Sequence, residues 1–130
     1  MWTYIQSSGK MFNPDGTMMA QGYSGAETIG KNNPKMEHLH NVGPIPVGFY
    51  TIGEAFDGSS HGPCVMRLTP DANNQMFGRD GFLIHGDLIS NPGNASQGCI
   101  IMPKFVREAI STSDDKRLEV KADFVVSTET

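Results

Sequence analysis

The chain has 130 residues, a typical length for one domain built around one hydrophobic core. Its 14 acidic residues outnumber its 10 lysine and arginine residues, giving a formal net charge of -4. The basic residues are scattered, and no basic run is longer than Lys116-Arg117, which argues against a nucleic-acid partner. No apolar run approaches the roughly 20 residues of a membrane-spanning helix. We therefore expect one domain over residues 1–130 and no membrane span.

The first half of the chain predicts short strands separated by turns. The Asn13-Pro14-Asp15-Gly16 segment is a strong turn signal, and it lies between two runs that can pair as a hairpin. Residues 23–41 are rich in glycine and asparagine and predict a long loop with one helical turn. We expect the strands of this half at Trp2–Gln6, Ser8–Phe12, Thr17–Gln21 and Phe49–Ile52.

The second half predicts further strands and one helix. Residues 56–63, 69–78 and 87–98 predict loops. Pro103 suits the first position of a helix, and the next apolar side chains are spaced for one helical face through about Ser111. We expect strands at Cys64–Leu68, Phe82–His85 and Leu118–Val126, and an apolar segment at Cys99–Met102. The predicted fold class is therefore mainly β, a β-sandwich or mixed sheet with one or two short helices.

A histidine and a cysteine form the candidate reactive pair. A thiol becomes a strong nucleophile only as thiolate, and a neighbouring imidazole can take its proton. His85 ends an apolar strand, and Cys99 follows Gly98 after a loop that can fold back toward the strand. Gly98 permits a sharp turn, and the backbone N–H groups near it and Cys99 can face an oxyanion. The Ser96 hydroxyl can orient either His85 or a loop carbonyl. This cluster predicts cysteine acyl transfer.

The other cysteine and two further histidines have simpler interpretations. Cys64 lies in an apolar strand, which favours core packing, while a disulfide with Cys99 stays open as the alternative. His38 and His40 lie two residues apart, without other clustered ligands at the usual zinc spacing. We therefore expect no metal and no cofactor.

Two more polar residues are interpreted as parts of loops. His61 sits among glycine and serine residues, which predicts a solvated loop position. Asp87 follows His85 by two residues, and a turn role in its loop is favoured over a role in orienting the imidazole.

Two motifs give the sequence a family resemblance. The string His85-Gly86, followed by Ser96-Gln97-Gly98-Cys99-Ile100, resembles the HG…SxGC[IV] signature of the YkuD-type L,D-transpeptidases. The segment Gly43–Tyr50 resembles the GPIPxGxY segment of the same superfamily. The layout around residues 78–87 and the tail after Pro103 is more similar to a compact branch, the Tlde1-like toxins delivered by type VI secretion. The resemblance covers roughly residues 8–121.

The resemblance implies a mostly β L,D-transpeptidase-like catalytic domain that acts on bacterial cell wall. Cys99 would attack the carbonyl of the third residue of a peptidoglycan tetrapeptide stem, and D-alanine would leave. Water as acceptor gives L,D-carboxypeptidase activity, and an amine gives a cross-link or exchange with a D-amino acid. By the same resemblance His85 is the base, and Ser96 and Gly98 complete the catalytic set.

One position departs from the family pattern. Many members carry an arginine directly after the Cys-Ile pair, where it can hold a substrate carboxylate, and Ile101 occupies this position here. The departure argues against ordinary cross-linking and agrees with the toxin-like branch. Arg79 and Arg107 are the candidates to replace the missing arginine, and Tyr23 and Ser24 are expected to cap the substrate groove. The expected substrate-binding residues are Gly86, Arg79, Tyr23, Ser24 and Arg107.

The toxin branch also implies a location and partners. Residues 1–4 lack the basic and apolar regions of a secretory signal, so we expect a protein that is already trimmed or is made in the cytoplasm and secreted without a cleaved signal. It would act in the periplasm of a target cell, with a peptidoglycan tetrapeptide stem and a cognate immunity protein as partners. The alternatives are a housekeeping L,D-transpeptidase and a non-catalytic peptidoglycan-binding module of the same fold. A papain-like or amidase-type hydrolase places cysteine before histidine, the reverse of the order here.

Overall fold

The structure, a computed structural model, describes residues 1–123 and is mainly β. The strands are β1 (Trp2–Ile5), β2 (Lys10–Phe12), β3 (Met18–Gln21), β4 (Tyr23–Ser24), β5 (Gly48–Ile52), β6 (Phe56–Gly58), β7 (Gly62–Pro70), β8 (Leu83–His85), β9 (Ile100–Ile101) and β10 (Arg117–Lys121). The helices are α1 (Glu27–Gly30), the 3-10 turn η1 (Pro34–Met36) and α2 (Lys104–Thr112). This content confirms the predicted fold class, a mixed sheet with two short α-helices.

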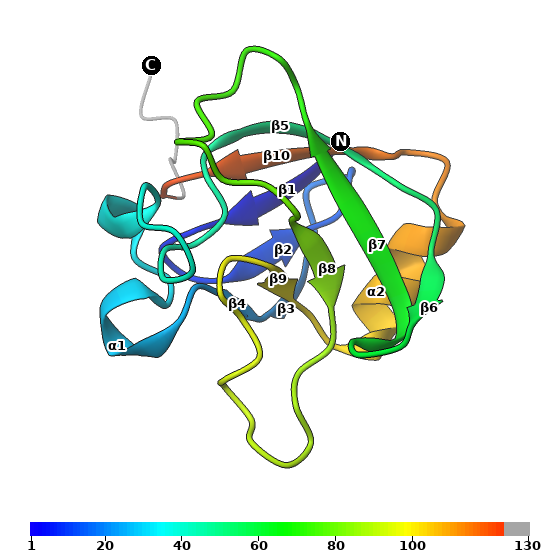
Figure 1. Cartoon of the computed structure of the whole chain (residues 1–130). Coiled ribbons are helices and arrows are strands. Elements are labelled where there is room, and N and C mark those ends of the chain that lie inside the picture. Colours follow the sequence, from blue (N-terminus) through cyan, green and yellow to red (C-terminus); the bar gives the residue numbers. More distant parts are fainter. Residues whose placement is uncertain (124–130) are drawn as a thin grey trace.

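The strands form one mixed sheet that curls until it is nearly closed (Figure 1). Its strand order is β3-β2-β1-β10-β5-β7-β8-β9-β4, and β6 pairs with β7 outside this path. The pairs β1–β10 and β8–β9 are parallel, and the other pairs are antiparallel. The two end strands, β3 and β4, are separated in the chain only by Gly22. The curled sheet therefore returns to its own starting edge.

Alternating apolar residues of the strands fill the inside of this curl. Tyr4, Tyr50 and Leu118 come from the neighbouring strands β1, β5 and β10 and are fully buried. Helix α2 packs against β7 and buries Val106 and Ile110, which lie four residues apart on one helical face. The core therefore fills the inside of the curl, and it joins the buried face of α2 to Ile84 of β8 and Ile100 of β9.

Most predicted elements are confirmed, with their ends shifted by a few residues. The first strand, the hairpin around residues 13–16, the strands at β5, β7 and β8 and the helix after Pro103 are all present. Pro103 itself is the N-cap, so the helix begins at Lys104. The long loop of residues 23–41 contains β4, α1 and η1.

Two predicted boundaries are corrected. The loop expected at residues 56–63 is wrong, because β6 and the start of β7 form a hairpin there. Its apolar Phe56 pairs with Val65, so the segment behaves as a strand despite its glycine and serine content. The last strand ends at Lys121, while the expectation extended it to Val126. Residues 124–126 of that expectation lie outside the described residues.

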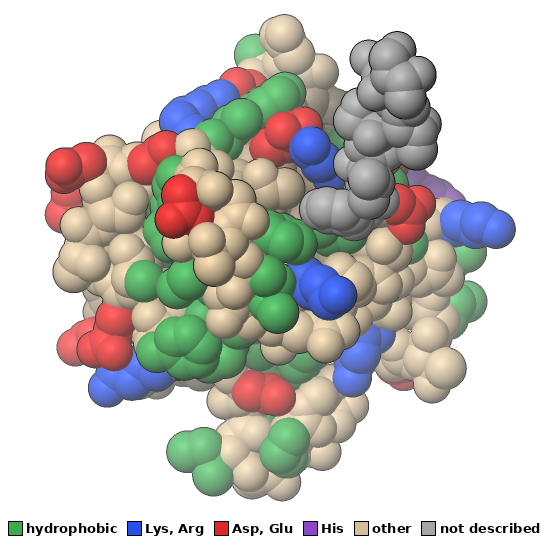
Figure 2. Space-filling view, turned by 180° about the vertical axis from the view of Figure 1, so that it is seen from behind, with side chains coloured by type: hydrophobic (Ala, Val, Ile, Leu, Met, Phe, Trp, Pro, Cys, Tyr) green, Lys and Arg blue, Asp and Glu red, His purple; other side chains and the backbone are tan. Residues whose placement is uncertain are grey.

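The surface shown in Figure 2 has scattered basic residues, as the sequence indicates, and the described helices are short. On the face shown in Figure 2, lysine and arginine side chains are separated by acidic and uncharged ones and form no continuous basic area. None of the helices within residues 1–123 is long and apolar enough to cross a membrane.

Candidate active site

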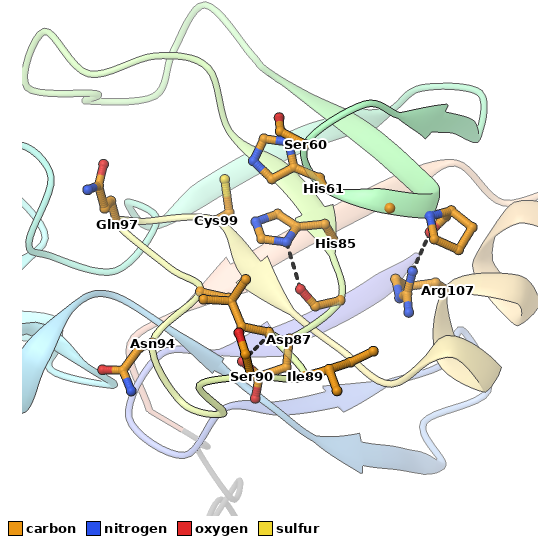
Figure 3. A pocket seen from close by; sticks show the side chains of 15 residues that line it. Ser60, His61, His85, Asp87, Ile89, Ser90, Asn94, Gln97, Cys99 and Arg107 are labelled. Atoms are coloured by element: carbon orange, nitrogen blue, oxygen red, sulfur yellow. Dashed lines mark hydrogen bonds between the residues drawn. The ribbon is translucent and has the colours of Figure 1, made fainter.

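Strands β8 and β9 bring the candidate nucleophile and base to one cleft. The two strands pair in parallel, with Ile84 opposite Ile100 and His85 opposite Ile101. Cys99 immediately precedes β9 and His85 ends β8, so both side chains lie at the same cleft, which has a volume of about 830 Å³ (Figure 3). The cleft is lined by residues 60–63, 85–90, 94, 95, 97, 99 and 107. A second, smaller cleft of about 200 Å³ reaches Cys99 from the side of Arg79.

The imidazole of His85 is oriented by the backbone. Its Nδ1 lies 2.8 Å from the carbonyl oxygen of Gly86. A carbonyl only accepts, so Nδ1 carries the proton and Nε2 keeps the lone pair of a base. Burial lowers the pKa of His85, and the neighbouring His61 and Arg107 lower it further. The ring is therefore neutral and able to accept a proton near pH 7.

The thiol of Cys99 is also neutral at rest. Burial raises its pKa, although the Leu83 N–H and the charge of Arg79 favour the thiolate. Among residues 1–123, no hydrogen bond joins the Cys99 Sγ to the His85 ring. Catalytic hydrogen bonds are often long before substrate binds. The arrangement therefore fits proton transfer during attack on a carbonyl, rather than a thiolate–imidazolium pair formed beforehand.

Ser96 organises the turn that presents the nucleophile. Its hydroxyl donates to the Cys99 carbonyl oxygen at 2.6 Å and accepts from the N–H groups of Gly25 (2.9 Å) and Gly98 (3.0 Å). Of the two roles considered for Ser96, the structure shows the contact with a loop carbonyl, and among the described residues no hydrogen bond joins Ser96 to His85. The Gly98 N–H is occupied by Ser96, so the Cys99 N–H is the remaining backbone candidate for an oxyanion hole.

Gly98 is required by close packing beneath the turn. Its φ is +144°, and a Cβ placed there would lie 2.6 Å from the Arg79 Nη2 and 2.8 Å from the Phe82 ring. Its carbonyl accepts from the Ser24 hydroxyl at 2.7 Å, and that hydroxyl accepts from the Ile45 N–H at 2.9 Å. Because Ser24 has no exposed surface, it supports the nucleophile turn and does not cap a groove as expected.

Arg79 holds two loops together below the nucleophile. Its guanidinium donates to the carbonyl oxygens of Glu37, Gly43, Pro44 and Gln97. Both terminal nitrogens are engaged in these bonds, and the side chain is only 7% exposed. The structure therefore shows Arg79 as a support for these loops, and its expected role in binding substrate stays a prediction.

Arg107 and Gly86 meet on the other side of the base. Arg107 lines the larger cleft and donates from Nε and Nη1 to carbonyl oxygens of Met102, Pro63 and Cys64. A Cβ on Gly86 would lie 2.8 Å from the Arg107 Nη2. Of the five expected substrate-binding residues, the structure brings these two to the cleft beside His85.

Tyr23 and Asp87 brace the loop of residues 87–98. The Tyr23 hydroxyl donates to Asp87 Oδ1 at 2.6 Å and accepts from the Ala95 N–H at 2.8 Å. Asp87 also accepts from the N–H groups of Leu88 and Gly93. Asp87 therefore has the turn role that the sequence favoured, and Tyr23 shapes the rim of the cleft by holding this loop.

His61 is a cleft residue that the sequence interpretation missed. It is exposed, as expected, but the β6–β7 hairpin places its ring 4.5 Å from the ring of His85, centroid to centroid. The sequence does carry a signal for this hairpin. The run Gly58-Ser59-Ser60 is typical of a turn, and it lies between the apolar residues Phe56 and Val65. Recognising the hairpin would have brought His61 toward the strand that carries His85.

The remaining cysteine and histidines have local roles. Cys64 and Cys99 are both free thiols, so the structure does not contain the disulfide left open above. His40 Nε2 lies 2.8 Å from the Phe77 carbonyl oxygen, and His38 packs edge-on against the Phe77 ring. Within residues 1–123, no three potential ligands group as a metal site.

Comparison with known proteins adds a family to this geometry. No curated protein and no solved structure matches the chain. One family model does match: that of the Tlde1 domain, a domain of type VI secretion effectors, over residues 18–128. The matched range includes His85, Cys99 and every cleft residue described above. The chain therefore belongs to the Tlde1 domain family.

Proposed function

We propose that this domain is a peptidoglycan-modifying cysteine enzyme with L,D-carboxypeptidase and L,D-transpeptidase activity. Its acyl donor is the tetrapeptide stem, and Cys99 attacks the carbonyl of the third residue. The observation that carries the proposal is the placement of Cys99 and His85 in one cleft, with Nδ1 of the imidazole held by the Gly86 carbonyl. A base with its free nitrogen in the nucleophile's cleft is the minimum machinery for thiol acyl transfer.

The reaction proceeds in two halves with the same base. The thiol proton passes to His85 Nε2 as Sγ bonds to the carbonyl carbon, and the Cys99 N–H donates to the developing oxyanion. The C–N bond breaks as His85 returns the proton to the leaving nitrogen; D-alanine departs, and the acyl group stays on Cys99 as a thioester. Water or an amine then attacks the thioester, giving up a proton through His85 to the departing Cys99 sulfur.

The family supports a role in competition between bacteria. A domain of type VI effectors is delivered into target cells, so we propose the target-cell periplasm as the place of action. An effector that damages cell wall also threatens its own producer, and we propose a cognate immunity protein as its partner.

The proposal is tested by mass spectrometry of purified tetrapeptide muropeptides incubated with the wild type. Conversion of tetrapeptide to tripeptide is expected, and added D-amino acids should produce the corresponding mass shift. Cys99→Ala and His85→Ala should each lose turnover by about 10³-fold or more while keeping the fold, because each removes a member of one catalytic pair. The circular dichroism spectrum checks the fold.

Cys64→Ala is the matched control, since it removes the other free thiol without touching the nucleophile. It should keep wild-type turnover. Unchanged muropeptides with folded wild type would reject the enzymatic proposal, and full activity in Cys99→Ala would reject this nucleophile.

A further inference from the structure

Arg107 is a buried cation that the backbone holds in a fixed orientation. Nε donates to Met102 O at 3.0 Å, and Nη1 donates to Pro63 O at 2.6 Å and to Cys64 O at 3.3 Å. Nη2 has no hydrogen bond to any residue of the described chain. No acidic side chain within residues 1–123 forms an ion pair with Arg107, although only 7% of its surface is exposed. A buried cation without a counter-charge favours an anionic ligand.

The order of groups along the cleft places this cation on one side of the nucleophile. In Figure 3 the side chain of His85 lies between the Cys99 sulfur and the Arg107 guanidinium. The contacts agree, because Gly86 accepts from His85 Nδ1 and also approaches Arg107 Nη2. The charge of Arg107 acts on His85, while the charge of Arg79 acts on Cys99. Arg107 therefore lies on the His85 side of the sulfur.

The chemistry assigns that side to the leaving group. In acyl transfer from an amide, the base that accepts the thiol proton must return it to the leaving nitrogen. The leaving amino acid therefore lies next to His85, and the groups beyond its nitrogen extend toward Arg107. For a single departing α-amino acid, the group beyond the nitrogen is a free carboxylate.

Resting on the proposed function, we propose that Arg107 Nη2 binds the α-carboxylate of the departing amino acid. The site then accepts stems in which one residue with a free carboxylate follows the scissile bond. Guanidinium and carboxylate match in geometry and charge. The bonds to Met102 and Pro63 already fix the guanidinium, so binding a carboxylate costs little further side-chain entropy.

The same carboxylate-binding position at Arg107 selects the acceptor in the second half of the reaction. A free α-amino acid that places its carboxylate on Arg107 presents its amino group to the thioester. Its nitrogen bonds to the acyl carbon, its proton passes to His85, and the Cys99 sulfur leaves and recovers that proton. Water competes for the thioester without using Arg107. A side-chain amine of a second stem can use this site only when a free carboxylate lies on the carbon that bears the amine.

The test compares two stems with the wild-type enzyme. One is the tetrapeptide ending in D-alanine, and the other is the same peptide ending in D-alaninamide, which removes the charge but keeps the scissile bond. We expect kcat/KM to be about 10- to 100-fold higher for the carboxylate, the range of a hydrogen bond to a charged group. Equal turnover of both peptides would overturn the role of Arg107 and leave the enzyme proposal standing. No turnover of either peptide would reject the enzyme proposal itself.

Variants then assign the preference to this side chain. Arg107→Gln should reduce the carboxylate preference to about threefold or less by losing rate on the carboxylate alone. Gly86→Ala crowds Nη2 and should have the same effect without removing Arg107, which keeps the test valid if Arg107→Gln does not fold. Arg67→Gln, an exposed arginine outside the cleft, is the matched control and should keep the full preference. A preference that survives in both folded cleft variants would overturn the proposal.

Discussion

Two arginines lie on opposite sides of the reactive pair and invite comparison. Arg79 and Arg107 are equally buried, each at 7% exposure, and each donates hydrogen bonds to backbone carbonyls. Arg79 uses both terminal nitrogens for four carbonyls below Cys99. Arg107 uses Nε and Nη1 beside His85 and leaves Nη2 at the cleft.

Because both arginines are equally buried, residue type and burial do not separate a supporting arginine from one proposed to bind substrate. The two side chains differ in which N–H donors remain without a backbone acceptor: both terminal nitrogens of Arg79 are used, whereas Nη2 of Arg107 is not. The loops around Gly43 and Gln97 depend on Arg79, whereas the cleft beside Gly86 has a donor available from Arg107. The predictions below separate these two roles, and they run from the largest expected effect to the smallest.

Replacing each arginine by methionine should affect stability unequally. Arg79→Met leaves four carbonyls without their donor, two of them fully buried, and should lower the free energy of unfolding by about 3 kcal/mol or more. Arg107→Met should cost about 1–3 kcal/mol, because two of its three acceptors are only partly buried. Urea denaturation of both variants measures the difference. A larger loss in Arg107→Met would reverse the assignment of the supporting role.

Adding one methyl group beneath the nucleophile tests the Arg79 side directly. Gly98→Ala places a Cβ 2.6 Å from Arg79 Nη2, so the turn must move, and kcat/KM should fall by about 100-fold. Gly16→Ala is the matched control, since Gly16 also has positive φ but nothing lies within 4 Å of its Cβ position. It should cost about 1 kcal/mol of stability and leave turnover intact. Unchanged kinetics in Gly98→Ala would show that Arg79 does not fix the nucleophile turn.

The reactivity of the Cys99 thiol tests whether Arg79 alone can ionise it. Burial raises the pKa of Cys99 despite the charge of Arg79, so alkylation by iodoacetamide at pH 7 should be slower than for an exposed cysteine in a peptide. The rate should rise with pH well above 8. The Cys64→Ala background removes the other thiol from the measurement. Rapid alkylation that is independent of pH from 5 to 8 would instead indicate a preformed thiolate.

The smallest effect concerns the protonation of His85 on the Arg107 side. Burial lowers the pKa of His85, and His61 and Arg107 repel its charged form. The neutral ring is the active form, so kcat/KM should decline only at pH values below the usual histidine range. His61→Ala removes both cover and repulsion, which raises the pKa of His85 and moves this acidic decline to higher pH. His61→Phe keeps a ring as cover and should move it less, and an unshifted profile in both variants would contradict the effect of His61.

The parts of the site that follow from local pattern were predictable. Asn13–Gly16 identifies the first hairpin, and the short apolar runs before His85 and after Cys99 become the paired strands β8 and β9. A strand that ends in histidine and a glycine turn before cysteine are both local features, so the sequence identifies His85 and Cys99 as the candidate pair, and the structure brings both to one cleft.

The supporting contacts were not predictable, because they join distant segments through the backbone. Arg79 reaches carbonyls 18 to 42 residues away, and the acceptors are peptide groups that every residue carries. Ser24 contacts Gly98 across 74 residues for the same reason. A side chain that binds another side chain leaves a complementary pair in the sequence, whereas one that binds the backbone leaves no such trace.

The pairing of β1 with β10 has a consequence for how the domain is made. Trp2 lies opposite Leu118, so the parallel ladder that joins the two ends of the described chain cannot form until nearly all of it has been synthesised. Until then β5, β7 and β8 have no continuous sheet on which to complete the curl. Sheets dominated by such distant pairings fold in milliseconds to seconds rather than microseconds. During translation, therefore, the sheet can close around the core only after β10 has been synthesised, whereas β8 and β9 can pair before it.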